Sequence, residues 1–140
     1  MRTSHSSAAT LMVVVLLACG ASQEALRQAQ FGGSGVTGER STVTVTPRSR
    51  GYIVRVEATG LVPGRTYELH LHRGRCVGPG SVRSRYDLPP MRADASGHGV
   101  VTTPVETGPP ADPGTVLHIH AGIVAGSADY RKVVCGALPG

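Results

Sequence analysis

The sequence has no tryptophan and one phenylalanine among its 140 residues, so any core must be built from valine, leucine, isoleucine and alanine. Hydrophobic residues make up 40% of the chain, which is enough for the core of one domain, the number that this length favours. Acidic residues are also few, 9 against 14 Lys and Arg, giving a formal net charge of +5. We expect no nucleic-acid partner, because the arginines are scattered and few aromatic residues lie beside them.

Helical periodicity is missing beyond the first residues. Glycine (19) and proline (10) form about a fifth of the chain and separate short segments in which polar and apolar residues alternate, a pattern typical of β-strands. The predicted strands are 25–31, 41–46, 52–58, a run within 67–76, 91–96, 100–105, 115–121 and 131–138. Short strands joined by Gly/Pro turns predict an all-β fold, an antiparallel sandwich or barrel.

No apolar run reaches the ~20 residues that span a bilayer as a helix. The run at residues 11–18, with Arg2 near the start, instead makes residues 1–18 a predicted secretion signal. The sequence Leu16-Leu17-Ala18-Cys19 resembles the bacterial lipoprotein cleavage box, in which the cysteine becomes the first mature residue and carries the lipid. We therefore expect a lipidated tether at 19–31, a folded domain at 32–140, and a membrane-anchored protein on the periplasmic or extracellular face of the cell envelope. An ordinary signal peptide cut a few residues later is the alternative.

Three cysteines are an odd number for an exported protein. Lipidation of Cys19 leaves Cys76 and Cys135 as a pair, and an oxidising compartment favours a disulfide between them. It would close a loop of about 60 residues and stabilise the fold by about 4 kcal/mol in the chain-entropy model. A metal-ligating role for these two thiols is the alternative.

Four of the five histidines beyond the leader fall in two His-x-His pairs, His70/His72 and His118/His120. Alternate residues of a strand share a face, so each pair presents two imidazoles opposite its apolar neighbours. A single such pair is common on a polar strand face that binds nothing. Two pairs in one small domain favour a metal site, and imidazole suits copper and zinc. The fifth, His98, lies in a predicted turn at 97–99 and is expected at the surface.

These residues resemble the copper/zinc superoxide dismutase family. There, a Gly-Leu-x-x-Gly turn precedes a His-x-His copper-binding strand and a disulfide cysteine. The matching segments here are Gly60-Leu61-Val62-Pro63-Gly64, Leu69-His70-Leu71-His72 and Cys76. Val134-Cys135-Gly136-Ala137-Leu138 is similar to the family's closing Ala-Cys-Gly-Val-Ile, which holds the other disulfide cysteine. Residues 115–120 are similar to the strand that brings a further copper histidine. Less specific similarities at 35–38 and 92–100 extend the match over most of residues 25–140. The resemblance implies a Greek-key antiparallel β-sandwich or barrel.

The sequence also departs from that family. Residues 77–90 contain no histidine, and Asp87 is their one carboxylate, so the zinc ligands and the histidine that bridges the two metals are missing from this loop. The family's arginine three residues before the closing cysteine is Lys132 here, with Arg131 next to it. Lysine attracts an anion but lacks the planar fork of arginine. The loop at 122–130 is shorter than the electrostatic loop at the corresponding place in the family.

The resemblance implies copper ligands among His70, His72, His118 and His120, and leaves open which of the last two aligns with the family ligand. Copper is the expected metal, and zinc is not expected. Lys132 and Arg131, with Arg73 and Arg75, are the expected cations for steering superoxide, the substrate in this family. Loss of the bridging histidine argues against efficient dismutation, so a non-catalytic copper-binding protein and a metal-free structural or interaction sandwich remain alternatives. The sequence makes no prediction of oligomeric state.

Overall fold

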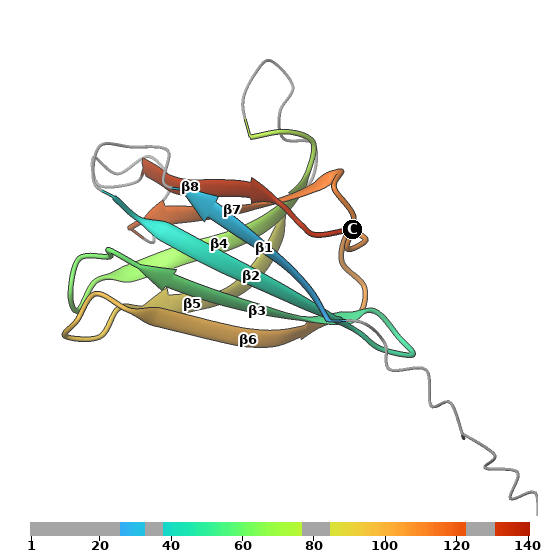
Figure 1. Ribbon diagram of the computed structural model, residues 1–140, viewed down its shortest axis with the longest axis horizontal. Coiled ribbons are helices and arrows are strands. Elements are labelled where there is room, and N and C mark those ends of the chain that lie inside the picture. Colours follow the sequence, from blue (N-terminus) through green and yellow to red (C-terminus); the bar gives the residue numbers. More distant parts are fainter. Residues whose placement is uncertain (1–25, 33–37, 77–84, 123–130) are drawn as a thin grey trace, which may run out of the picture.

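The computed structural model describes residues 26–32, 38–76, 85–122 and 131–140, and these ranges contain strands and no helix (Figure 1). The strands are β1 (Arg27–Gly32), β2 (Arg40–Pro47), β3 (Tyr52–Thr59), β4 (Thr66–Arg73), β5 (Tyr86–Arg92), β6 (Gly99–Val105), β7 (Thr115–Ala121) and β8 (Arg131–Ala137). Within the described ranges, no helix is long and apolar enough to cross a membrane. The predicted all-β fold is confirmed.

The strands form two four-stranded antiparallel sheets that face each other (Figure 1). The first sheet has the order β1-β2-β3-β6, and the second has the order β5-β4-β7-β8. Strands β5 and β6 lie side by side where the sheets meet, which gives the order β7-β4-β5-β6 around the sandwich. Three consecutive strands followed by one that returns beside the first make a Greek key, as predicted.

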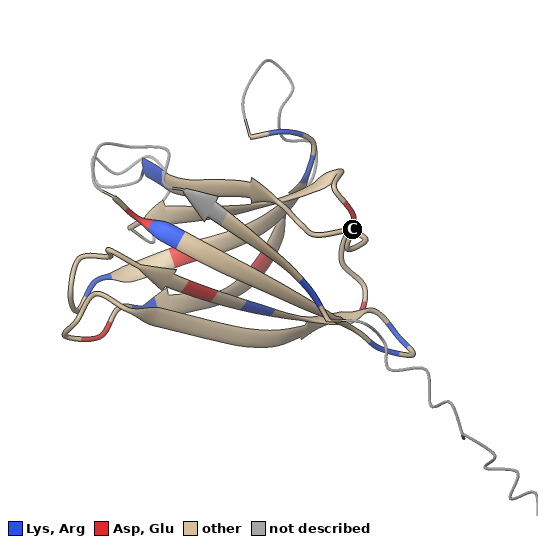
Figure 2. Cartoon of the chain, viewed as in Figure 1, with Lys and Arg blue, Asp and Glu red and all other residues tan. Residues whose placement is uncertain are grey.

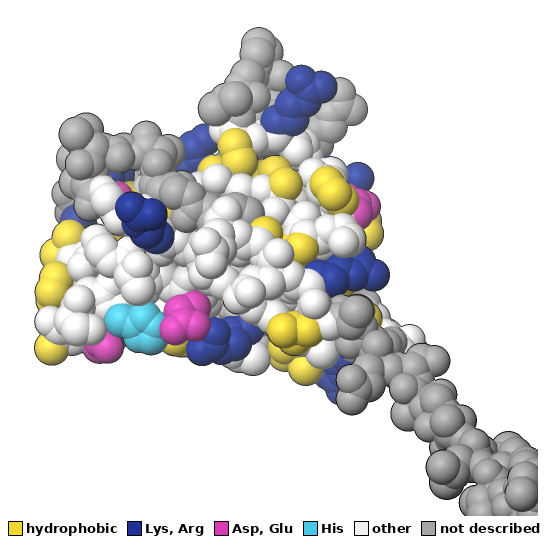
Figure 3. Space-filling view, in the orientation of Figure 1, with side chains coloured by type: hydrophobic (Ala, Val, Ile, Leu, Met, Phe, Trp, Pro, Cys, Tyr) yellow, Lys and Arg dark blue, Asp and Glu magenta, His cyan; other side chains and the backbone are white. Residues whose placement is uncertain are grey.

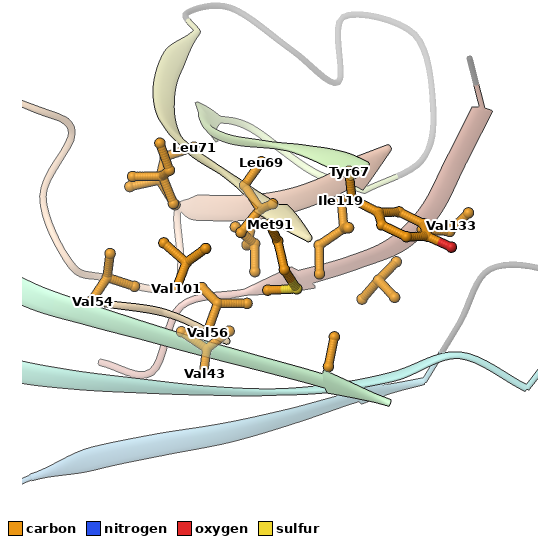
Figure 4. Close-up of a cluster of buried hydrophobic side chains, with 14 of the residues drawn as sticks. Val43, Val54, Val56, Tyr67, Leu69, Leu71, Met91, Val101, Ile119 and Val133 are labelled. Carbon is orange, nitrogen blue, oxygen red and sulfur yellow. The ribbon is translucent and has the colours of Figure 1, made fainter. Parts of the chain in front are cut away.

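The core lies between the sheets and follows the alternation seen in the sequence (Figure 4). Val43 and Val45 of β2 and Val54 and Val56 of β3 are at most 1% exposed, while the residues between them are half-buried. The second sheet contributes its own alternate side chains. Those are Tyr67, Leu69, Leu71, Leu117, Ile119 and Ala121. The core is aliphatic as predicted, although two tyrosines and a methionine, Tyr52, Tyr67 and Met91, join it.

The turn between β3 and β4 closes one end of the core. Leu61 is 4% exposed, and its backbone N–H donates to the carbonyl of Gly97 at 3.0 Å. Gly97 has φ of 78°, and a side chain there would place Cβ 2.4 Å from the Leu61 carbonyl oxygen, so only glycine fits. Gly60 is also at positive φ, and a Cβ there would lie 2.9 Å from the Gly38 carbonyl oxygen. The Gly-Leu-x-x-Gly segment is therefore a tight turn that presents β4 to the second sheet.

The predicted strand at 91–96 is wrong, because the strand here is β5, Tyr86–Arg92. Residues 94–97 form a turn in which the Asp94 carboxylate accepts hydrogen bonds from the backbone N–H groups of Ser96 and His98, at 2.8 and 3.0 Å. Pro89 and Pro90 suggested a loop, yet they lie within β5 at the edge of the second sheet. The pairing with β4 shifts register between Tyr67 and Leu69, opposite these prolines, which is where a strand tolerates them.

Strand β1 pairs with β2 along its whole length, so the predicted edge strand at 25–31 exists from Arg27. The segment expected to be a tether thus contributes a strand to the first sheet. The predicted signal at 1–18, Cys19, and the loops at 77–84 and 123–130 lie outside the described residues.

Candidate metal centre

The two His-x-His segments lie on neighbouring strands. In the antiparallel pairing of β4 with β7, His70 is directly opposite His118 and Glu68 is opposite His120. The leucine and isoleucine neighbours of these histidines face the core, as the alternation predicted. All four imidazoles are therefore on the outer face of the second sheet, and the predicted approach of the two segments is found in the structure.

The four rings form a quadrilateral. Ring centroids are 5.6 Å apart for His70 and His72, 4.7 Å for His72 and His118, 5.7 Å for His118 and His120, and 5.2 Å for His120 and His70. Although this is an outer face, His70, His72 and His118 are only 2, 5 and 4% exposed, and His120 is half-buried. The sheet thus carries a cluster of buried imidazoles outside the apolar core.

Burial favours the neutral form of three of these imidazoles, those of His70, His118 and His120. It lowers the pKa of His118 to about 3 and that of His120 to about 4, and in both cases a neighbouring histidine adds to the effect. The pKa of His70 is also lowered, chiefly by burial and then by the positive charge of Arg85. A neutral imidazole has a ring nitrogen with a free lone pair, which is the form that binds metals.

Some of the ring nitrogens are not satisfied by hydrogen bonds. Within the described part of the chain, Nε2 of His118 and Nε2 of His70 are buried and make no hydrogen bond. The latter lies 3.1 Å from a carboxylate oxygen of Glu68, without the alignment of a hydrogen bond. A buried polar atom left without a partner costs about 1–3 kcal/mol, so these nitrogens fit a site that takes a ligand.

The nitrogens do not converge on a single point in this side-chain arrangement. Among the described residues, the one set of three His, Cys, Asp or Glu side chains whose donor atoms all lie within 4.8 Å of one another is Cys76, His118 and Cys135. The two cysteines form the predicted disulfide, with an S–S distance of 2.05 Å and a Cα–Cα distance of 5.7 Å. A metal held by three or four imidazoles would therefore require ring rotation from the present positions.

The cations expected to attract an anion are engaged in local contacts. Lys132 is paired with His120 across β7 and β8, and its Nζ donates to the carbonyl oxygen of Cys76 at 2.7 Å. Arg131 lies 3.7 Å from the buried carboxylate of Glu39. Arg73 donates to Asp112 and, at 2.8 Å, to the Thr115 hydroxyl.

Sequence reasoning missed the charged groups next to His70. A cavity of about 260 Å³ opens there and is lined by Thr66, Glu68, Leu69, His70, Arg85, Asp87, Leu88 and Pro90. Arg85 forms ion pairs with both Asp87 and Glu68, and Asp87 lies 3.6 Å from Nε2 of His70. Glu68 was detectable, because it precedes His70 by two residues and so shares its face. In Figure 2 the positions of Lys, Arg, Asp and Glu are spread over several strands and turns.

Comparisons with protein-family models and with curated proteins gave no match. Solved structures do match. A SOD-like protein from Bacillus subtilis aligns with a TM-score of 0.60 and 18% identity, over 80% of this chain and 97% of that one. A double variant of a SOD-like protein from that organism, with two residues replaced by histidine, aligns with a TM-score of 0.57 and 19% identity, over 79% of this chain and 97% of that one. A variant with one such replacement aligns with a TM-score of 0.58 and 21% identity, over 81% of this chain and 97% of that one. The chain therefore has the fold of the superoxide dismutase-like proteins.

Proposed function

We propose that this protein is an exported, lipid-anchored member of the cell envelope that binds copper through His70, His72, His118 and His120. The observation that carries the proposal is the cluster of four adjacent imidazoles, in which the buried Nε2 atoms of His70 and His118 make no hydrogen bond. The lipid anchor rests on the cleavage-box sequence ending at Cys19.

Copper is favoured over other metals by the donor set. Imidazole nitrogen suits copper and zinc, and copper binds more tightly than zinc to a given set of such ligands. The residues between 77 and 90 supply no histidine for the zinc site of the resembling family. Each of the four histidines would donate a ring nitrogen, and the carboxylate of Glu68, near Nε2 of His70, would orient that ring.

Copper binding without turnover is the function supported best. The full chain, with its disulfide intact, is titrated with Cu²⁺ in a calorimeter. We expect one tightly bound ion per chain and loss of that binding in a His70→Ala/His72→Ala double variant. The matched control is His98→Ala, which removes a histidine from the turn before β6, outside the cluster, and is expected to bind copper normally. Absence of binding by the unmodified chain would refute the proposal.

Superoxide dismutation is the second candidate, and the positive charge of Lys132 beside the cluster favours it. Lys132 lies across from His120, so an anion approaching that histidine meets a cation, whereas Arg85 next to His70 is paired with Glu68 and Asp87. Bound copper would supply redox cycling between two oxidation states. The copper-loaded chain should then remove superoxide faster than the His70→Ala/His72→Ala variant. Equal rates would leave copper binding as the function.

A metal-free structural or interaction module is the remaining alternative. It predicts that all four histidines can be replaced with little loss of stability or function, and that the unmodified chain binds no copper. The calorimetric titration therefore separates it from both copper proposals.

A further inference from the structure

The disulfide and one histidine of the cluster lie in contact range on the second sheet. Cys135 of β8 is directly opposite His118 of β7, and Cys76 follows the end of β4. A ring nitrogen of His118 and the two sulfurs all lie within 4.8 Å of one another. His118 is 4% exposed, and its Nε2 has no hydrogen-bond partner among the described residues. The disulfide thus has a buried, unsatisfied imidazole beside it.

We propose that Cys76, Cys135 and His118 form a binding site for Zn²⁺ when the disulfide is reduced. The same two cysteines would then clamp β8 to the segment after β4 in either state, covalently when oxidised and through the metal when reduced. The site shares His118 with the proposed copper site but forms only after reduction, so it does not require bound copper.

The distances are compatible with zinc. Bonds of about 2.3 Å to sulfur and 2.0–2.1 Å to imidazole nitrogen in a tetrahedral site put neighbouring donors roughly 3.3–3.8 Å apart. The sulfurs, bonded at 2.05 Å, must separate, whereas His118 is already within 4.8 Å of both. Two cysteines and one histidine are a known zinc set with a fourth position for another ligand. His72, whose ring centroid is 4.7 Å from that of His118, is the nearest imidazole for that position.

The chemistry balances with one external reductant. A dithiol gives up two electrons and two protons to the S–S bond, becomes a disulfide itself, and leaves Cys76 and Cys135 as thiols. Zn²⁺ then replaces the two thiol protons, which pass to solvent, and accepts a lone pair from His118. In the oxidised state neither sulfur is a thiolate, so the site exists only after reduction.

The test uses the full chain and Co²⁺ as a spectroscopic probe. One sample is oxidised, and another is reduced with a phosphine, which becomes a phosphine oxide and leaves no competing thiol. We expect the reduced chain to bind one Co²⁺ with a thiolate-to-cobalt charge-transfer band that Zn²⁺ abolishes, and the oxidised chain to show no such band. A reduced chain without the band, or an equal band in both samples, overturns the proposal.

A second measurement needs no altered cysteine. When the free Zn²⁺ concentration is 100 times Kd, the fraction of reduced chain without zinc falls about 100-fold. Alkylation of Cys76 and Cys135, which needs the metal-free thiols, should therefore slow by about the same factor. His118→Asn should lose most of this protection, whereas His98→Asn should keep it. Equal protection in His118→Asn overturns the assignment of the third ligand.

His70→Asn separates this site from the proposed copper site. It should weaken copper binding by the oxidised chain while leaving the cobalt band of the reduced chain unchanged. A cobalt band that disappears in His70→Asn would show that the thiolate-bound metal also depends on His70, and a site made of Cys76, Cys135 and His118 would be rejected.

Discussion

The outer faces of the two sheets differ although their strands alternate in the same way. On the first sheet, the outward residues of β2 and β3, such as Thr42, Thr44 and Arg55, are half-buried, and the surface in Figure 3 is mainly uncharged and polar with few basic or acidic side chains. On the second sheet, the outward residues His70 and His118 are almost completely buried. An antiparallel sheet commonly leaves one face to solvent, so buried polar groups on that face need an explanation.

The contrast between the two faces is clearer when two histidines are compared, His98 in the turn before β6 and His118 within β7. The side chain of His98 is 36% exposed, and its Nε2 lies 2.8 Å from a carboxylate oxygen of Glu57, which also accepts a hydrogen bond from Arg55. The ring of His118 is buried, with Nε2 unsatisfied. His98 is thus a partly exposed histidine with a carboxylate partner, whereas His118 is a buried, neutral histidine that could bind a metal. The two histidines differ in burial and in position, because His98 lies in the turn before β6 whereas His118 lies within β7.

The largest expected difference concerns the disulfide, which joins two segments of the second sheet 59 residues apart in sequence. Replacing it by Cys76→Ala/Cys135→Ala should lower the free energy of unfolding by about 2–5 kcal/mol, because the unfolded chain regains the freedom that the cross-link removed. Denaturant unfolding measures this. The control on the outer face of the first sheet, Thr102→Ala, should stay within about 0.5 kcal/mol. Similar values for both variants would contradict the prediction.

The next effect is on pH dependence and comes from the second sheet alone. In the unfolded chain His118 takes up a proton near pH 6.5, whereas in the folded chain its pKa is about 3. The unfolded state therefore binds more protons below pH 6.5, and the metal-free protein loses stability as the pH falls from 7 to 5, by about 2 kcal/mol for this one group. Urea unfolding at several pH values measures the slope.

His118→Asn is the variant that tests the origin of this slope. It removes one titrating group and should make the loss of stability between pH 7 and pH 5 smaller. An unchanged slope would show that His118 does not remain neutral in the folded protein.

The smallest effect is expected on the first sheet. Hydrogen bonds from Arg55 and His98 lower the pKa of Glu57, but the group is solvent-accessible. Glu57→Gln should therefore leave the midpoint of thermal unfolding unchanged within error, because exposed ion pairs contribute little. Glu68→Gln, the corresponding change beside the buried ring of His70, should shift the midpoint measurably. A larger shift for Glu57→Gln would reverse the comparison of the two faces.

Much of the fold was predictable because alternation identifies half-buried strands. Val43 and Val45, or Leu69 and Leu71, mark the core face without any knowledge of the partner strand. The pairing of His70 with His118 followed from the resemblance to a known family, since parity places both on one face but does not make their strands neighbours. The Cys76–Cys135 disulfide followed from the odd cysteine count.

Other features depend on tertiary context. Pro89 and Pro90 indicate a loop in sequence, and only an edge position with a register shift accommodates them in β5. Burial of the histidine face cannot be derived from alternation, because the pattern says which residues share a face and not whether that face is covered. The ion pairs of Arg85 with Glu68 and Asp87 were missed for the same reason.

The two prolines of β5 have a consequence for encounters between protein molecules. Successive residues of a strand direct their N–H groups to opposite sides, so consecutive prolines remove one donor facing β4 and one facing outward. The β5 margin of the histidine-bearing sheet, beside which β6 lies, is thereby a poor template for an added strand from a second molecule, which limits fibril-like stacking on that side.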